Sequence, residues 1–231
     1  MNTLEIDSVR LSFSNFSREQ RILTDCYLNC VSGEIIGVLG RNGCGKSSLF
    51  KIIFGSLNPA NKFIRINGEV CSQPFKKKLV GYIPQVSIFP GDFTVNKLLK
   101  FLFGKERLES IKSYERIESI LKTKIRKLSG GELKYLEVLT MLHMNHPFIL
   151  LDEPFSGVEP IYQKEIQVLL KSNPQNKGIL LTDHNYRNIL EVSDRLYLLR
   201  EGVLKHVTDF SELELYGYVP SGTFGKWKLC Y

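Results

Sequence analysis

Residues 40–47 have the composition and spacing of a loop that binds phosphate groups. The segment reads GRNGCGKS, a glycine and four variable positions followed by Gly-Lys-Ser. Glycines let the backbone curl so that several N–H groups converge on one anion, and the helix that follows adds its positive end. We expect Lys46 to reach the outer phosphates of a nucleotide and the Ser47 hydroxyl to bind Mg²⁺. The predicted phosphate-binding residues are Gly40, Arg41, Asn42, Gly43, Cys44, Gly45, Lys46, Ser47 and Ser48. A chance glycine turn between a strand and a helix is the alternative.

Two adjacent carboxylates, Asp152 and Glu153, follow the fully apolar segment 148–151. Charged residues at the carboxyl end of a buried strand lie where open α/β sheets bind ligands. We predict that Asp152 holds Mg²⁺, through water, and that Glu153 polarises a water in line with the γ-phosphate. Two surface acids before a proline turn are the alternative interpretation.

A further glycine-rich helix start follows at Ser129-Gly130-Gly131. Its backbone N–H groups could bind an anion as well. If both helix starts contacted one nucleotide, the second would most naturally come from another copy of the chain.

The pattern of apolar residues predicts the elements that carry these groups. Apolar runs predict strands at 4–13, 22–31, 34–39, 63–66, 80–84, 148–151, 178–182, 195–200 and 203–207. Residues 14–20 are polar enough to form a turn or loop. Helical spacing predicts helices after residue 47, within 94–123 with a break at Gly104, from residues 128–132 to about Met144, and over 160–170. Strands alternating with helices from residue 34 onward indicate a parallel sheet that is covered on both faces. No pattern can be interpreted in 211–231, which contains the lone Trp227.

Composition sets the class of protein. The 231 residues are 43% hydrophobic and 24% charged, which predicts one soluble domain with a substantial core. We expect a cytosolic protein, because the chain has no apolar run of membrane length and its first residues do not resemble a signal peptide. Its five cysteines show no metal spacing, and His143 and His146 lack companion ligands, so we expect free thiols and structural histidines. The net charge of +7 is expected to form a solvated basic face or one that meets membrane headgroups or a partner, with no specific nucleic acid.

Six motifs in order over about residues 4–205 resemble the ATP-binding subunits of ABC transporters. They are the phosphate loop at 40–48, a Q-loop at Gln85, the signature LSGGE at 128–132, the second phosphate motif at 148–153, a D-loop at 156–159 and a switch histidine at His184. The signature is far more specific than the phosphate loop.

The resemblance implies a role for each matched residue. Phe13 would stack on adenine, although its spacing fits a core phenylalanine equally well. Gln85 would contact Mg²⁺ or the attacking water and sense a transmembrane partner. The signature residues would touch the γ-phosphate of ATP held by the opposite subunit; they are Ser129, Gly130, Gly131 and Glu132. His184 would contact the γ-phosphate from the same subunit, so the implied catalytic residues are Glu153, His184 and Gln85.

The same resemblance implies the fold and the partners. The fold would be an α/β P-loop NTPase with a mostly parallel core sheet, an antiparallel β subdomain and a helical signature subdomain. Within one domain, 1–84 and 145–210 would form the core with the β subdomain, 86–144 the helical subdomain and 211–231 a tail. The cofactors would be ATP and Mg²⁺, and the partners a second copy on ATP binding and transmembrane permease subunits. The chain would be cytoplasmic, peripheral on the inner face of the inner or plasma membrane.

Finer likenesses concern the type of transporter. Segments 151–161 and 182–185 are most similar to the lipopolysaccharide-export ATPase group, and branched-chain amino-acid importers share much of this sequence. A soluble ABC ATPase acting on ribosomes or DNA is the rival; one cassette with a short insertion favours transport. Glu159 stands where the family usually has aspartate, and the insertion from Gln85 to Leu128 is compact.

Overall fold

The computed structural model describes residues 1–15 and 18–224, with side chains for all of these except 13–15 and 18–20. The strands are β1 (Thr3–Asn15), β2 (Arg18–Val31), β3 (Ile35–Leu39), β4 (Asn61–Ile66), β5 (Glu69–Val70), β6 (Val80–Ile83), β7 (Phe148–Asp152), β8 (Gly178–Thr182), β9 (Arg195–Arg200) and β10 (Val203–Val207). The helices are α1 (Lys46–Phe54), α2 (Val95–Leu102), α3 (Lys105–Lys112), α4 (Glu115–Ile120), α5 (Gly130–His143), α6 (Pro160–Ser172), α7 (Tyr186–Val192) and α8 (Ser211–Leu215), with a 3-10 turn η1 at Ile125–Lys127.

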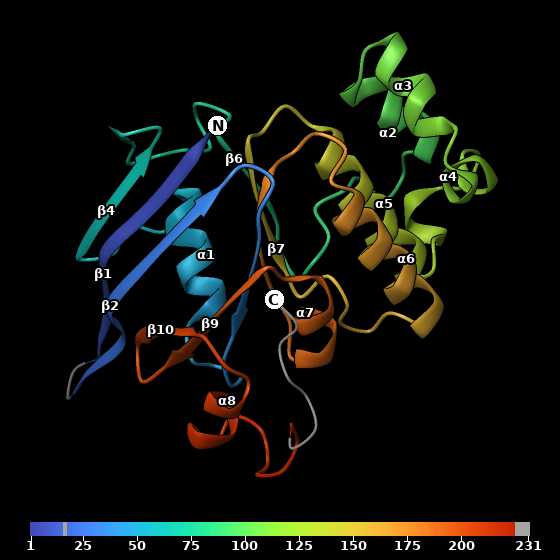
Figure 1. Cartoon of the computed structure of the whole chain (residues 1–231). Helices are drawn as coiled ribbons and strands as arrows, with labels where there is room; N and C mark the ends of the chain where they lie inside the picture. The colour runs from blue at the N-terminus through green and yellow to red at the C-terminus, as the bar shows by residue number, and fades with distance from the viewer. Residues whose placement is uncertain (16–17, 225–231) are drawn as a thin grey trace.

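The described strands form one sheet in the order β5-β4-β1-β2-β10-β9-β3-β8-β7-β6. The part from β9 to β6 is parallel throughout, as the alternation of strands and helices predicted. The pairings of β1 with β2 and β4, and of β4 with β5, are antiparallel. Figure 1 shows β1, β2 and β4 on one side of the molecule, with α2, α3 and α4 at the far end.

Two apolar cores cover the two faces of the parallel strands. Successive residues of a strand point to opposite faces, so β3, β7 and β8 contribute alternate side chains to each core. On one face Leu150 and Leu180 pack with α1 and with β1 and β2; on the other, Leu151 and Leu181 pack with α5, α6 and α7. Both faces are buried, which explains why these strands are apolar runs rather than alternating ones.

The prediction of a turn or loop over the whole of 14–20 was wrong, because β1 runs to Asn15 and β2 begins at Arg18. Ser14 pairs with Glu19 and Asn15 with Arg18, so the antiparallel ladder continues through these polar residues. Backbone groups make this ladder whatever the side chains are. Both strands are therefore longer than the sequence predicted.

The helical segment contains one more break than its sequence predicted. The break at Gly104 is present, where α2 gives way to α3, and a second separates α3 from α4. There the Ser113 hydroxyl donates to the Ser110 carbonyl (2.8 Å) and Tyr114 is extended. A serine that bonds to its own preceding turn competes with the helix. Among the described residues no helix is both long and apolar enough to cross a bilayer.

Candidate functional site

The glycine-rich loop joins the end of β3 to the start of α1. Gly43 (φ 78°) and Gly45 (φ 111°) take the left-handed backbone conformation that glycine tolerates best. A side chain at Gly45 would also bring its Cβ within 2.9 Å of Ile22 Cγ2. No side chain caps the N-terminus of α1, so its first N–H groups remain available to an anion.

A cavity of about 500 Å³ opens at this loop. Its lining residues are Ile22, Asn42, Gly43, Gly45, Lys46, Ser47, Ser48, Gln85 and Glu153. Lys46 is buried, and its Nζ donates to the carbonyl oxygens of Gly40 (2.8 Å) and Arg41 (3.2 Å). The ammonium group is thus folded over its own loop, next to the predicted phosphate site.

Asp152 ends β7 beside the loop and is 2% exposed. The Ser47 hydroxyl donates to its Oδ1 (3.1 Å), and the Tyr82 hydroxyl donates to its Oδ2 (2.9 Å). Mg²⁺ takes hard oxygen ligands and often needs only one or two from the protein, with waters and phosphates completing its shell. A serine hydroxyl beside a carboxylate fits that requirement, so Ser47 and Asp152 could hold Mg²⁺.

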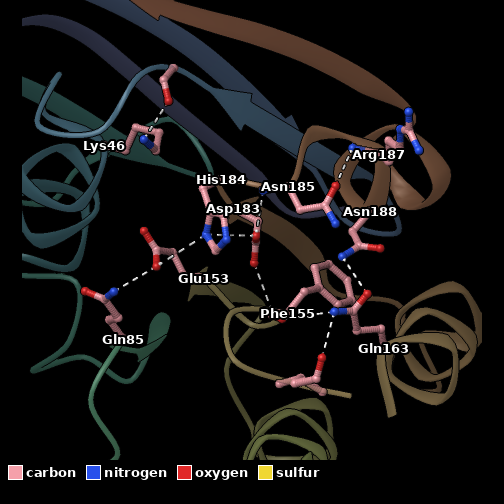
Figure 2. A network of polar contacts seen from close by, with 12 residues as sticks. Lys46, Gln85, Glu153, Phe155, Gln163, Asp183, His184, Asn185, Arg187 and Asn188 are labelled. Carbon is pink, nitrogen blue, oxygen red and sulfur yellow. Dashed lines mark hydrogen bonds and ion pairs between the residues drawn. The ribbon is translucent and has the colours of Figure 1, made fainter. Parts of the chain in front are cut away.

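Glu153, Gln85 and His184 come from three separate segments and point toward one another (Figure 2). Gln85 Nε2 donates to Glu153 Oε2 (2.8 Å), and His184 Nδ1 lies 3.9 Å from the same oxygen. The His184 side chain is 51% exposed and that of Glu153 is 17% exposed. The structure therefore brings together the three residues that the resemblance assigned to catalysis.

The backbone of Glu153 is left-handed (φ 56°), which is unusual outside glycine and asparagine. Its N–H donates to the Thr182 carbonyl (2.8 Å), so the end of β8 fixes this turn. The turn interrupts the alternation of side chains along β7. This is how two adjacent acids can both face the loop.

Asp183 supports the same region, although no sequence motif assigns it a role. It is fully buried, its Oδ2 accepts from the N–H of Phe155 (2.9 Å), and its Oδ1 accepts from the N–H of Asn185 (2.9 Å). Burial raises its pKa, while the two backbone donors oppose that shift. Asp183 thereby ties the segment after Glu153 to the segment that carries His184 (Figure 2). Its place beside His184 at a strand end was the available signal.

The signature segment begins α5, outside the residues that line the cavity at the loop. The Ser129 hydroxyl accepts from the N–H of Glu132 (3.2 Å), and the Glu132 carboxylate accepts from the N–H of Ser129 (2.8 Å). This reciprocal cap fixes the helix start while Ser129 and Gly130 stay exposed. A side chain at Gly131 would collide with the ring of Tyr162, at 2.3 Å.

Lys134 links the signature helix to the Q-loop. Its Nζ donates to the Gln85 carbonyl (3.2 Å) and pairs with Glu137 Oε2 (3.1 Å). A shift of α5 would therefore be transmitted to the backbone of Gln85 through this hydrogen bond. Phe13 lies on β1, but its side chain is outside the described part of the structure, so the adenine contact stays a prediction.

The start of the C-terminal tail also reaches the phosphate loop. Arg41 Nη2 donates to the Gly217 carbonyl (3.0 Å), just beyond α8. Tyr218 and Phe224 pack edge-on against Tyr186 at the start of α7. Sequence patterns did not predict this contact, and Trp227 lies outside the described residues.

A second hollow, about 360 Å³ in volume, lies between β6, α2 and α5. Its lining is almost wholly apolar: Tyr82, Ile83, Ile88, Phe89, Pro90, Phe93, Leu98, Phe101, Leu102, Met141 and Met144, with Glu137 and Thr140. Ile88 is 70% exposed and Phe101 79% exposed. We call this hollow the apolar groove. Exposed apolar surface of this kind marks interaction sites.

Comparison with known proteins identifies the family. The ABC transporter family model matches residues 23–156, more than half of the chain. The chain belongs to the ABC transporter family. The lipopolysaccharide export system ATP-binding protein LptB of Acidithiobacillus ferridurans is 33% identical over 199 residues, which are 80% of this chain and 83% of that protein.

Solved structures of ABC cassettes share the fold. A nucleotide-free ATP-binding cassette from an ABC transporter has a TM-score of 0.79 at 20% identity, over 95% of this chain and 96% of that one. The dimeric structure of the bacterial cassette MJ0796 has a TM-score of 0.74 at 21% identity, over 87% of this chain and 96% of that one. The predicted α/β P-loop NTPase fold and the assignment as an ATP-hydrolysing enzyme of this family are confirmed. ABC ATPases bind ATP, dimerise and pair with membrane components.

Proposed function

We propose that two copies of this ABC ATPase close around two ATP molecules and drive separate membrane subunits that export lipopolysaccharide or a related lipid. The observation that carries the enzymatic part is the meeting of Gln85, Glu153 and His184, because Gln85 and Glu153 line the cavity of the phosphate loop and His184 lies beside Glu153. Three segments far apart in the sequence would not converge there for stability alone, since their polar side chains stay partly exposed.

Hydrolysis would proceed with the triphosphate lying along the N-terminus of α1. Lys46 would turn from its own loop carbonyls to the outer phosphates, and Ser47 and Asp152 would hold Mg²⁺, which supplies charge neutralisation when bound. Glu153 would take the proton of the attacking water as the bond between the γ-phosphorus and the bridging oxygen breaks. Gln85 and His184 would orient Glu153 and the γ-phosphate.

The second copy would supply the signature residues that complete this site. Ser129 and Gly130 are exposed at the start of α5, whose cap joins only Ser129 and Glu132, and they do not line the cavity of their own subunit. Such a helix start attracts anions. We place it on the γ-phosphate held by the partner. ATP would then favour the closed dimer, and release of products would remove that preference.

We place the membrane subunits in the apolar groove of the proposed helical subdomain, 86–144. The groove adjoins the segment that follows Gln85, so a bound partner would be next to a residue of the hydrolytic site. The similarity to LptB supports an exported lipid as the cargo. The chain's division into a core, this subdomain and a tail is part of the same proposal.

Replacing Phe101 by aspartate should abolish co-purification of the membrane subunits from detergent-solubilised membranes. A charge in the groove would have to be desolvated by the partner. Val168→Asp is the matched control, because Val168 is 68% exposed on α6, away from the groove. Equal recovery of the membrane subunits with both variants would contradict the proposed docking site.

Mass spectrometry of the co-purified subunits tests the cargo. We expect integral proteins of a lipid-export system. Recovery of amino-acid permease subunits, or of ribosomal proteins without any integral partner, would overturn the assignment.

A further inference from the structure

Tyr82 occupies a position on β6 that faces the end of β7. It is paired in register with Leu150, which lies on the same face of the sheet as Asp152, two residues later. The Tyr82 side chain therefore lies on the α1 side of the sheet, where its hydroxyl donates to Asp152 Oδ2 at 2.9 Å. None of the six family motifs contains this residue.

The ring of Tyr82 is held by α1, the helix that starts at the phosphate loop. Phe54, at the end of α1, lies 5.5 Å from it between ring centroids and is tilted by 45°. Phe54 in turn contacts Phe75 at 5.2 Å. Tilted aromatic pairs at these distances are attractive, so the direction of the hydroxyl is set by packing and not only by its hydrogen bond.

The hydroxyl groups of Ser47 and Tyr82 hold the Asp152 carboxylate from two sides. Ser47 donates to Oδ1 and Tyr82 to Oδ2, and the side chain is almost entirely buried. Without the Tyr82 hydroxyl, Oδ2 would lose its only hydrogen bond from a described side chain. The carboxylate would then be free to rotate toward Ser47, and a rotated ligand binds a cation less well.

We propose that Tyr82 is a positioning residue that holds Asp152 in the orientation needed for the divalent cation. The inference rests on the proposed role of Asp152 as a magnesium ligand. It predicts that removal of one hydroxyl changes the affinity for the cation and leaves the affinity for the nucleotide alone unchanged. Partners that orient a metal ligand are typically worth about 10- to 100-fold in metal affinity.

The test is Tyr82→Phe in the full chain, which keeps the ring against Phe54. Binding of a fluorescent ATP analogue is followed while Mg²⁺ is varied, and again in EDTA. We expect the Mg²⁺ concentration for half-maximal binding to rise about 10-fold or more, with unchanged binding in EDTA. Tyr197→Phe is the control, since Tyr197 is a buried tyrosine of β9 whose hydroxyl accepts from Arg195; it should show no shift.

Asp152→Asn and the double variant that combines it with Tyr82→Phe distinguish the positioning role of Tyr82 from the magnesium role of Asp152. If Tyr82 acts through Asp152, the double variant requires the same Mg²⁺ concentration as Asp152→Asn alone. If the Mg²⁺ concentration for half-maximal binding rises in Asp152→Asn but not in Tyr82→Phe, the positioning role is overturned and the proposed function stays intact. Additive shifts, or weaker binding of Tyr82→Phe in EDTA, would also overturn it. No shift in Asp152→Asn would overturn the magnesium role itself.

Discussion

Replacing Glu153 by glutamine is expected to lower ATP turnover by about 10²- to 10⁴-fold, the usual contribution of a positioned general base. The change is nearly isosteric, and a glutamine carbonyl can still accept the hydrogen bond from Gln85 Nε2. What is lost is the negative charge that takes the proton of the attacking water. Phosphate release from ATP under saturating Mg²⁺ measures the loss, and binding of a fluorescent ATP analogue should stay within about twofold of the parent.

Glu201→Gln is a matched control for this variant. Glu201 is also a glutamate in the left-handed conformation (φ 52°), but it lies exposed in the turn between β9 and β10. Its replacement should leave turnover unchanged. Parental turnover in Glu153→Gln would refute Glu153 as the base.

Removal of the Lys46 ammonium group should weaken nucleotide binding instead. Hydrogen bonds to charged groups are worth about 1.5–3 kcal/mol, so Lys46→Ala should raise the dissociation constant for ATP by roughly 10- to 150-fold. In the structure, Nζ donates to the carbonyls of Gly40 and Arg41. When the nucleotide binds, these two hydrogen bonds would be replaced by bonds to the phosphates. Titration with the fluorescent analogue measures the effect.

Lys51 offers the comparison for Lys46, because it is an exposed lysine on the same helix α1. Lys51→Ala should bind the nucleotide as the parent does. Equal dissociation constants for Lys46→Ala and the parent would show that Lys46 does not reach the phosphates.

The sequence predicted those parts of the site that depend on short, local patterns of residues. Glycines at fixed spacing indicated the loop, the apolar run of β7 marked where Asp152 and Glu153 would lie, and Ser129-Gly130-Gly131 indicated the start of α5. Each pattern spans fewer than ten residues. The parallel core followed from the same kind of evidence, because strands buried on both faces are continuous apolar runs.

The contacts that the sequence did not predict depend on register or on long-range packing. The hydrogen bond from Tyr82 to Asp152 requires the pairing of β6 with β7, and that of Asp183 with the Phe155 N–H requires the end of β8 to face the turn after β7. The Lys134 bond to the Gln85 carbonyl likewise joins residues 49 apart in sequence. Polarity over 14–20 was misleading, because backbone hydrogen bonds extend the pairing of β1 with β2 whatever the side chains are.

The central claim is that ATP is held between the phosphate loop of one copy and the signature of the other, and sedimentation of Glu153→Gln tests it most directly. This variant should retain ATP and so accumulate the closed dimer, doubling its mass when ATP and Mg²⁺ are added. Adding Ser129→Arg should leave a monomer, whereas Ser110→Arg, at an exposed serine on α3, should still dimerise. A Glu153→Gln variant that stays monomeric with ATP, or a Ser129→Arg variant that dimerises equally well, would contradict the account.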